Sequence, residues 1–222
     1  MESFLHAAPP LASILVYLVP FKTISDVSRS QTSGDLPSLT FVSMAVTSAI
    51  WGTYGGLKND PTLIVPNFVG AVLSLYYLYV FEANTPKGSR LTELYTYYQA
   101  SILLLGFLLF SLYWEDFENS RELVGTCGAV LSVVFSSSPL SALPAVIRTR
   151  SPESIPLPIS LVMFANSVLW ASYGYFLAND RSIWFPNLVG TFVSSLQLLV
   201  HIVFFAGLIP KKNLDGVKSA SL

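Results

Sequence analysis

Two tryptophans and two asparagines hold matching places in two similar stretches, IWGTYGGLKNDPTLIVPNFVG and LWASYGYFLANDRSIWFPNLVG. They are Trp51 and Asn67 in the first stretch and Trp170 and Asn187 in the second. An indole ring packs on flat C–H faces, and an amide offers a hydroxyl group both a donor and an acceptor. Taken singly, each Trp also fits an aromatic belt and each Asn an interhelical hydrogen bond. Their occurrence as pairs favours a site for a neutral, polyhydroxylated ligand such as a carbohydrate.

The composition around these residues is that of a membrane protein. Of the 222 residues, 52% are hydrophobic and 11% are charged, whereas about 25% of a soluble domain is charged. The formal net charge of −1 excludes a basic surface for nucleic acid. The single cysteine, Cys127, excludes an internal disulfide and a cysteine metal cluster, and we expect no cofactor. The start, MESFLHAAPP, lacks a positive region before its apolar run, so we expect the first span to be retained.

Seven apolar segments are long enough to cross about 30 Å of hydrocarbon as helices. They are residues 4–27, 36–57, 63–81, 94–114, 123–147, 155–177 and 183–209. The predicted fold class is therefore an all-α membrane protein with seven transmembrane helices. Lys22 lies near the end of the first segment, where we expect it to snorkel or to line water.

The distribution of Lys and Arg predicts the orientation. Nine of these residues fall on one side of the membrane: Lys22, Arg29, Lys87, Arg90, Arg148, Arg150, Lys211, Lys212 and Lys218. Three fall on the other: Lys58, Arg121 and Arg181. The positive-inside rule then places the N-terminus outside or in a lumen and the tail, residues 210–222, in the cytosol. Both the plasma membrane and an endomembrane such as the vacuole or Golgi remain open.

An internal repeat organises the chain. Six pairs are 119 residues apart: Ser13 and Ser132, Pro20 and Pro139, Pro37 and Pro156, Trp51 and Trp170, Tyr54 and Tyr173, Gly55 and Gly174. Five more are 120 apart: Asn59 and Asn179, Asp60 and Asp180, Pro66 and Pro186, Asn67 and Asn187, Gly70 and Gly190. Each copy holds three helices, and the unmatched fourth helix makes the two copies parallel. We therefore expect a 3+1+3 arrangement: a first repeat at 1–82, a linker helix with its loops at 83–119, and a second repeat at 120–209.

Two parallel repeats predict a central path between them, with a site near the membrane midplane. Trp51 lies seven residues before Lys58, and Asn67 lies seven residues after Asp60. At about 1.5 Å per residue, both lie about 10 Å inside the outer boundary. Because the second copy repeats these depths, the two Trp and two Asn side chains are predicted to form one ring around the axis.

Four prolines, Pro20, Pro37, Pro139 and Pro156, fall toward the cytosolic ends of their segments. Proline removes a backbone donor and kinks a helix, so a ring of four suits a set of hinges. Pro37 and Pro156 also fit the first turn of a helix, where proline is favoured. Pro20 and Pro139 follow long apolar runs, so a kink is expected there.

The chain resembles the SWEET family of sugar facilitators. The resemblance spans residues 13–205 and is most specific in SSPLSALPAVIRTRSPESIPLPISL, WASYG and NDRSIWFPNLVG. It implies bidirectional uniport of mono- or disaccharides by alternating access, with Asn67 and Asn187 as sugar-binding residues and Trp51 and Trp170 as aromatic walls. Further pocket positions implied by the resemblance are Thr47, Asn166, Ser13, Val16, Ser132 and Phe135. It also implies that Pro20, Pro37, Pro139 and Pro156 are gating hinges and that Tyr54 with Asp180 closes an outer gate.

The titratable residues favour facilitated diffusion. Asp26, at the edge of the first segment, is the one acid within the seven segments, whereas proton-coupled carriers generally need an intramembrane relay. His201 is the one mid-span candidate, and a lone histidine there favours an interhelical hydrogen bond. The expected partners are a sugar and membrane lipid, and flat helix faces allow homo-oligomers.

Three other functional classes fit the sequence less well. A related repeat carrier for an amino acid or another small metabolite shares the 3+1+3 layout, but such carriers typically carry Pro-Gln dipeptides and an intramembrane acid. A seven-helix receptor does not predict an internal repeat. An intramembrane hydrolase needs a Ser and His pair, for which His201 is a weak signal, so we do not expect an enzyme.

Overall fold

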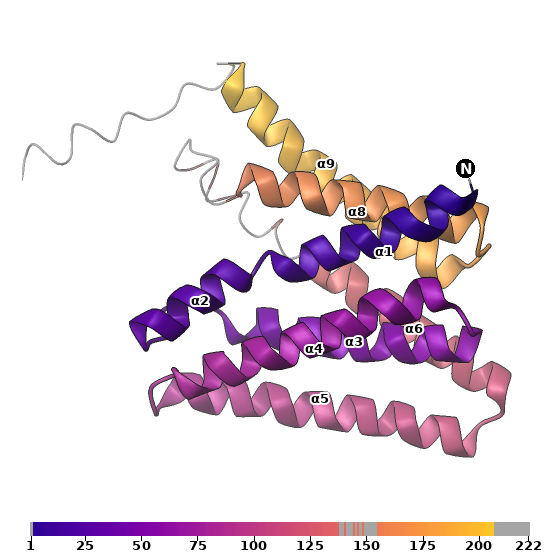
Figure 1. Cartoon of the computed structure of the whole chain (residues 1–222), viewed down its shortest axis with the longest axis horizontal. Helices are drawn as coiled ribbons and strands as arrows, with labels where there is room; N and C mark the ends of the chain where they lie inside the picture. Colours follow the sequence, from indigo (N-terminus) through magenta and orange to yellow (C-terminus); the bar gives the residue numbers. More distant parts are fainter. Residues whose placement is uncertain are drawn as a thin grey trace, which may run out of the picture.

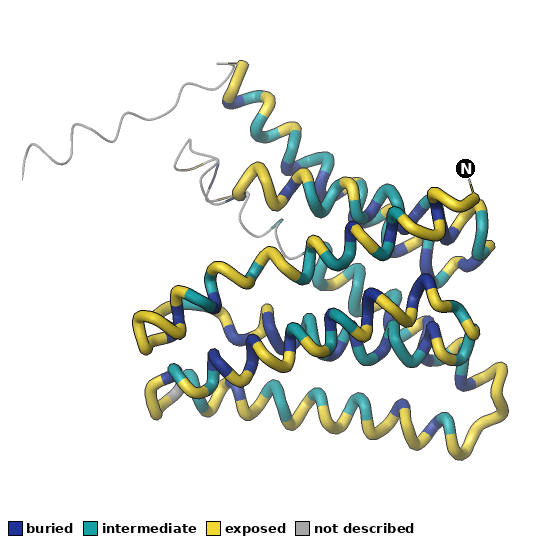
Figure 2. The backbone as a smooth tube through the Cα atoms, in the orientation of Figure 1, coloured by how far each residue is buried: buried dark blue, intermediate teal, exposed yellow. Residues whose placement is uncertain are grey.

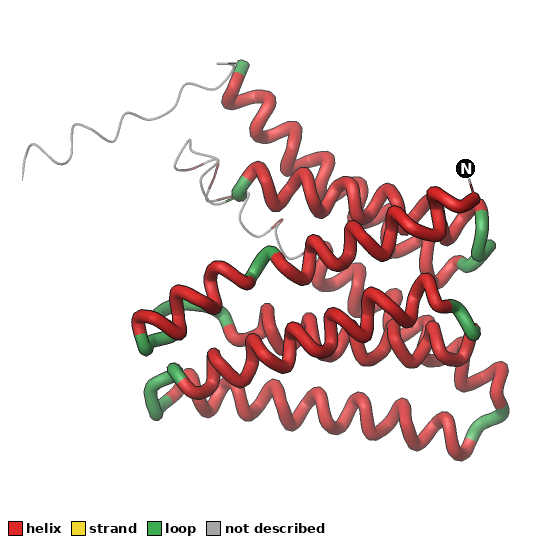
Figure 3. The backbone as a smooth tube through the Cα atoms, viewed as in Figure 1, coloured by secondary structure: helices red, strands yellow, loops and turns green. Residues whose placement is uncertain are grey.

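Helices make up nearly all of the described chain (Figures 1 and 3). The computed structural model describes residues 2–137, 140, 144, 146, 148 and 155–206. The long helices are α1 (Glu2–Leu18), α2 (Phe21–Ser30), α3 (Ser38–Lys58), α4 (Pro61–Ala83), α5 (Ser89–Trp114), α6 (Phe117–Ser137), α8 (Leu157–Phe176) and α9 (Arg181–Phe205). The predicted hinge Pro139 and the tail 210–222 lie outside the described residues.

Five helical stretches within the described chain are long and apolar enough to cross a membrane. They are Glu2–Ser30, Pro61–Ala83, Arg90–Trp114, Leu157–Phe176 and Arg181–Phe205. Helices α3 and α6 have 21 residues each, which at about 1.5 Å per residue also spans the hydrocarbon. Their more polar sequences, such as FENSRE at the start of α6, fit the interior and the ends of a bundle.

The first predicted segment is not one continuous helix. It divides at Val19 and Pro20, where a kink was expected, so one candidate span, Glu2–Ser30, is built from two helices. Pro20 has no N–H to continue the hydrogen bonds of α1, and its carbonyl accepts from Ile24 N at 2.9 Å, which begins α2. Lys22 lies exposed on α2 and pairs with Asp26 at 2.7 Å, one helical turn away.

The two other predicted hinge prolines that the structure describes, Pro37 and Pro156, mark helix starts. Pro37 and Pro156 directly precede α3 and α8, in extended backbone with φ −75° and −65°. Pro158 lies in the first turn of α8, where its missing N–H costs no helical hydrogen bond. Helices α5 and α6 begin five and six residues earlier than predicted, at Ser89 and Phe117. The prediction marked only the apolar part of each helix, whereas both begin with a polar turn.

The helices form two groups of three with one helix at the side. Helices α1, α3 and α4 form the first group, and α6, α8 and α9 form the second. Helix α1 packs against both α4 and α8, and α3 packs against α6, so the groups meet along these helices (Figure 1). Helix α5 packs mainly on α3 and exposes most of its other side chains, as lipid contact requires (Figure 2). The exact domain bounds given above stay a prediction.

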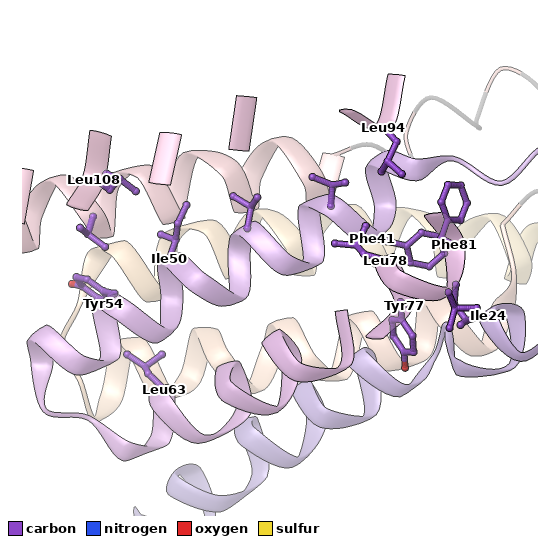
Figure 4. Packing of buried hydrophobic residues seen from close by; sticks show 14 of the residues in the cluster. Ile24, Phe41, Ile50, Tyr54, Leu63, Tyr77, Leu78, Phe81, Leu94 and Leu108 are labelled. Carbon is purple, nitrogen blue, oxygen red and sulfur yellow. The ribbon is translucent and has the colours of Figure 1, made fainter. Parts of the chain in front are cut away.

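A buried aromatic cluster holds the first group together at the end away from the α3–α4 turn. Phe41 lies 5.3 Å from Phe81 and 6.3 Å from Tyr77 between ring centroids, and Ile24 of α2 packs on the same cluster (Figure 4). Leu94 of α5 joins it, which attaches the side helix. Fully burying side chains of this size is worth about 1.5–3 kcal/mol each. This packing holds α2, α3, α4 and α5 together at that end.

Candidate functional site

Two Asn-Asp turns shape one end of the bundle, which we call the turn end: it carries the α3–α4 and α8–α9 turns, and α1 starts there (Figure 1). Asn59 and Asn179 adopt the left-handed conformation, with φ 50° and 44°, which asparagine tolerates better than most residues. Asp60 then caps α4 by accepting from Thr62 N at 3.0 Å. Asp180 caps α9 in the same way. Each turn therefore needs Asn followed by Asp.

The second carboxylate oxygen of each aspartate reaches the other repeat. The Tyr54 hydroxyl donates to Asp180 Oδ2 at 2.6 Å, and the Tyr173 hydroxyl donates to Asp60 Oδ2 at 2.5 Å. We call these contacts the Tyr54 latch and the Tyr173 latch. They tie the two repeats together at the turn end. The Tyr54–Asp180 pairing expected from the resemblance is therefore present as a contact.

A cavity of about 250 Å³ lies between the two repeats. Its walls come from α1, α3 and α4 on one side and α6, α8 and α9 on the other. All ten side chains predicted to bind substrate line it: Ser13, Val16, Thr47, Trp51, Asn67, Ser132, Phe135, Asn166, Trp170 and Asn187. The structure thus brings the predicted set together, and their binding role stays a prediction.

Reciprocal hydrogen bonds cross the cavity. Trp51 Nε1 donates to Ser132 Oγ at 3.1 Å, and Trp170 Nε1 donates to Ser13 Oγ at 2.7 Å. Each tryptophan also meets its own repeat's latch tyrosine edge to face, at 5.6 Å for Trp51–Tyr54 and 5.5 Å for Trp170–Tyr173. The two indole rings are therefore fixed in equivalent poses, each reaching a serine of the opposite repeat.

The two predicted asparagines are not equivalent. The Nδ2 atoms of both donate one turn back along their own helices, to Leu63 O at 2.8 Å and to Ile183 O at 2.7 Å. Asn67 Oδ1 also accepts from the Tyr17 hydroxyl at 3.0 Å, whereas no described residue donates to Asn187 Oδ1. Asn67 is 7% exposed and Asn187 is half-buried. The amide of Asn187 is therefore the more available one.

The cavity wall is polar but uncharged. Its other members are Tyr17, Ser43, Met44, Leu63, Ser136, Met163, Ser167, Ile183 and Pro186. Among the described residues, no Asp, Glu, Lys, Arg or His side chain lines it. Within residues 2–137 and 155–206, moreover, no group of three or more His, Cys, Asp or Glu side chains is arranged to hold a metal ion. This wall suits a neutral ligand with many hydroxyl groups.

Three contacts were missed by the sequence analysis. The repeat relates Tyr54 to Tyr173 and Asp180 to Asp60, so a Tyr54–Asp180 pair implies the Tyr173–Asp60 contact, and the sequence could have predicted it. Lys58 lies 2.7 Å from Asp180 Oδ2, and its repeat position is Ala178, so the repeat gave no signal. Tyr17 was missed for the same reason, because its repeat position is Ser136.

Comparisons with known proteins agree with this architecture. The family described as sugar efflux transporter for intercellular exchange matches residues 4–88 and 122–207, which are two separate stretches of similar length. The chain is 29% identical over 199 residues to sugar transporter SWEET1 of Rattus norvegicus, covering 90% of this chain and 89% of the relative. It is 28% identical over 201 residues to bidirectional sugar transporter SWEET11 of Arabidopsis thaliana, covering 87% and 68%.

A solved structure shares the fold. The 3.7 Å resolution structure of a eukaryotic SWEET transporter superposes with a TM-score of 0.82 at 21% identity, covering 91% of this chain and 95% of that one. At this identity the match bears on the fold alone. It confirms the predicted all-α membrane fold with seven transmembrane helices in a 3+1+3 arrangement.

Proposed function

Because the chain belongs to the family of sugar efflux transporters for intercellular exchange, we propose that it carries sugars across a membrane in both directions, as a uniporter working by alternating access. The observation that carries the proposal is the cavity between the repeats, whose described wall is uncharged, with Trp51 and Trp170 held by reciprocal bonds and no described residue donating to the Asn187 carbonyl. The names of the relatives, sugar transporter and bidirectional sugar transporter, support the same substrate class.

The chemistry of the cavity supports a sugar over an ionic metabolite. A sugar ring presents C–H faces to the indoles and hydroxyls to the amides, and a hydroxyl both donates and accepts. An amino acid would bring two charges into a cavity wall that carries none. Burying an uncompensated charge costs several kcal/mol, so such a ligand would be rejected.

The latches support alternating access. Both tyrosine–aspartate contacts close the turn end, so a substrate that leaves toward that side requires both to open. The helix break at Pro20 and the helix starts at Pro37 and Pro156 lie away from the turn end, where bending would move α1, α3 and α8 against one another. Pro139 is included in this hinge set by its repeat relation to Pro20.

The remaining titratable residues favour uniport without proton coupling. His201 donates from Nε2 to the backbone oxygen of Ile155 at 2.6 Å, and it does not line the cavity. Ile155 lies just before α8, so His201 bonds the segment that leads into α8 and not, as expected from the sequence, another helix. Since no carboxylate or histidine of the part of the chain that the structure describes lines the cavity, that part offers no group there for proton transfer. The protein is proposed as a carrier and not an enzyme.

The proposed setting is a lipid bilayer, with the turn end outside or in a lumen. The nine-to-three distribution of Lys and Arg supports this orientation, with the C-terminal tail in the cytosol. The exposed apolar faces of α5 and α9 suit lipid or another copy of the chain. Both the plasma membrane and an endomembrane fit this proposal.

Counterflow in proteoliposomes tests the function. Vesicles are loaded with unlabelled glucose or sucrose, and entry of the labelled sugar is followed for the unaltered protein, for Asn187→Ala, and for Tyr79→Phe as a control. Tyr79 is 74% exposed on α4 and does not line the cavity. We expect exchange that is unaffected by an imposed pH difference, lost in Asn187→Ala and retained in Tyr79→Phe. Folded protein that exchanges neither sugar contradicts the proposal, and uptake driven by a pH difference alone contradicts uniport.

A further inference from the structure

Tyr17 breaks the correspondence between the two halves of the cavity. It lies on α1, and the residue 119 positions later is Ser136. The Tyr17 hydroxyl donates to Asn67 Oδ1 at 3.0 Å and accepts from Ser48 Oγ at 3.1 Å. The Tyr77 hydroxyl donates to the backbone oxygen of Tyr17 at 2.9 Å. These contacts fix the phenol ring in one place in the first half of the cavity.

The phenol ring fits only because α4 has a glycine beside it. A Cβ atom at Gly70 would collide with the ring carbons of Tyr17. At the matching glycine of α9, Gly190, the nearest atoms to a Cβ would be Ser167 Oγ at 2.7 Å and Ser136 Oγ at 3.5 Å. A hydroxymethyl group therefore stands in the second half where a phenol ring stands in the first. The second half is left with the smaller side chain at this position.

The hydrogen-bonding capacity of the two halves differs in the same sense. An amide offers two N–H donors and a carbonyl oxygen with two lone pairs. Asn187 uses one N–H on Ile183 O, and no described residue donates to its carbonyl oxygen, so one donor and both lone pairs are left for a ligand. Asn67 uses one N–H on Leu63 O and one lone pair of its carbonyl oxygen on Tyr17, and the residue is 7% exposed. Toward a ligand, Asn187 therefore keeps the larger accepting capacity, and Asn67 acts mainly through its remaining N–H.

We propose that Tyr17 sets the sugar specificity of the carrier. Its hydroxyl bonds the Asn67 carbonyl, and its ring fills the first half of the cavity. One monosaccharide ring then binds, and Asn187 supplies both a hydrogen-bond donor and an acceptor to it. The inference rests on the proposed sugar transport. The cavity of about 250 Å³ is smaller than the ~300–1,000 Å³ typical of pockets for drug-sized ligands. That size suits one sugar ring better than two.

The first test uses monofluorinated glucoses as competitors of glucose counterflow. Fluorine in place of a hydroxyl cannot donate a hydrogen bond, so it weakens binding only where the sugar hydroxyl donates to the protein. In the unaltered protein, the hydroxyl that faces Asn67 should tolerate fluorine, because Tyr17 already bonds the Asn67 carbonyl oxygen and Asn67 acts on the ligand mainly as a donor. Tyr17→Phe frees the Asn67 carbonyl and keeps the ring. At least one fluorinated glucose that competes as well as glucose in the unaltered protein should then compete about three- to tenfold less well, which corresponds to the loss of one hydrogen bond.

The second test uses Tyr17→Ser, which copies Ser136 into the first half. The added space should raise the sucrose-to-glucose rate ratio by about tenfold or more, since pocket volume discriminates ligands on this scale. The control Tyr79→Phe changes an exposed tyrosine of the first repeat and should alter neither the fluorine pattern nor the rate ratio. Thermal unfolding in detergent establishes that each variant is folded before transport is measured.

The outcomes separate the two proposals. If the unaltered protein exchanges no sugar, the proposed function is wrong and this inference falls with it. If it exchanges glucose while Tyr17→Phe leaves the fluorine pattern unchanged and Tyr17→Ser leaves the rate ratio unchanged, only the role of Tyr17 is wrong. Sucrose exchanged as fast as glucose by the unaltered protein also overturns the inference, because the ring would then impose no size limit.

Discussion

The Lys58 ammonium lies 2.7 Å from Asp180 Oδ2, and the corresponding position in the second repeat is the uncharged Ala178. Asp180 therefore has both a hydroxyl and a cation from the first repeat, whereas Asp60 receives the Tyr173 hydroxyl. Beside the Tyr173 latch, His6 lies 3.1 Å from Thr62 Oγ1 through Nδ1. Its ring centroid is 5.8 Å from that of Tyr173. The turn end is closed by two latches of matching geometry but different charge.

Lys58→Met should weaken the Tyr54 latch. Asp180 is 8% exposed, so loss of its cation leaves a charge that is poorly solvated in the closed form and better solvated when the turn end opens. Because Lys58 itself is partly exposed, we expect an effect of about 1 kcal/mol, a fivefold shift toward the open turn end. Spin labels at Val65 and Phe185, equivalent exposed positions on α4 and α9, report the separation in a background without Cys127. An unchanged distance distribution would refute this reading.

Tyr54→Phe and Tyr173→Phe form a matched pair. Each removes one hydroxyl that donates to a carboxylate, an interaction worth about 1.5–3 kcal/mol. Asp180 keeps Lys58 after the first change, but the second removes the cross-repeat hydrogen bond of Asp60. Tyr173→Phe should therefore open the turn end more than Tyr54→Phe, as read by the same label pair. Tyr175→Phe, 61% exposed on α8, serves as the control. Equal effects would mean that Lys58 contributes nothing to closure.

Gly125→Ala should disturb the Tyr54 latch by crowding the Tyr54 ring. A Cβ at Gly125 would lie 2.7 Å from a ring carbon of Tyr54 and 3.0 Å from Ser182 Oγ, so the Tyr54 ring or the α6 backbone must shift, which we expect to disturb the bond to Asp180. Overpacking of this kind typically costs about 1–3 kcal/mol. Gly106→Ala on α5 has nothing within 4 Å of the added atom and should be neutral or slightly stabilising. Thermal unfolding of both variants in detergent makes the comparison, and equal melting temperatures would contradict the crowding argument.

Pro20→Ala should allow α1 and α2 to join into one helix. Alanine restores the N–H that proline lacks and has the highest helix propensity, so the break at Val19 and Pro20 loses its cause. If the break acts as a hinge, glucose exchange should slow while binding is retained. Pro158→Ala, in the first turn of α8, should leave the exchange rate unchanged because proline there breaks no helical bond. Similar rates for both variants and the unaltered protein would remove Pro20 from the hinge set.

Apolarity located the helices well and their ends less well. Marking where charges stop found the spans but missed the polar first turns at Ser89 and Phe117, which the chain folds as helix outside the apolar stretch. It also joined α1 and α2, because a proline inside an apolar run does not by itself reveal whether the helix bends or stops. The starts of α3 and α8 were better indicated, since Pro37 and Pro156 each stand directly before the first helical residue.

The sequence by itself determined the membrane class and the 3+1+3 order, and together with the family resemblance it named ten of the side chains around the central cavity. Composition decides whether a chain is stable in lipid, and the 119- and 120-residue spacings place equivalent residues at equal depths in both repeats. Only the tertiary structure decided which side chains meet across the repeats. Successive helical residues point about 100° apart, so the partner of a side chain depends on how neighbouring helices are rotated and inclined. That rotation aims Tyr17 at Asn67, whereas no described residue donates to the Asn187 carbonyl, an inequality that the two similar stretches around the asparagines do not reveal.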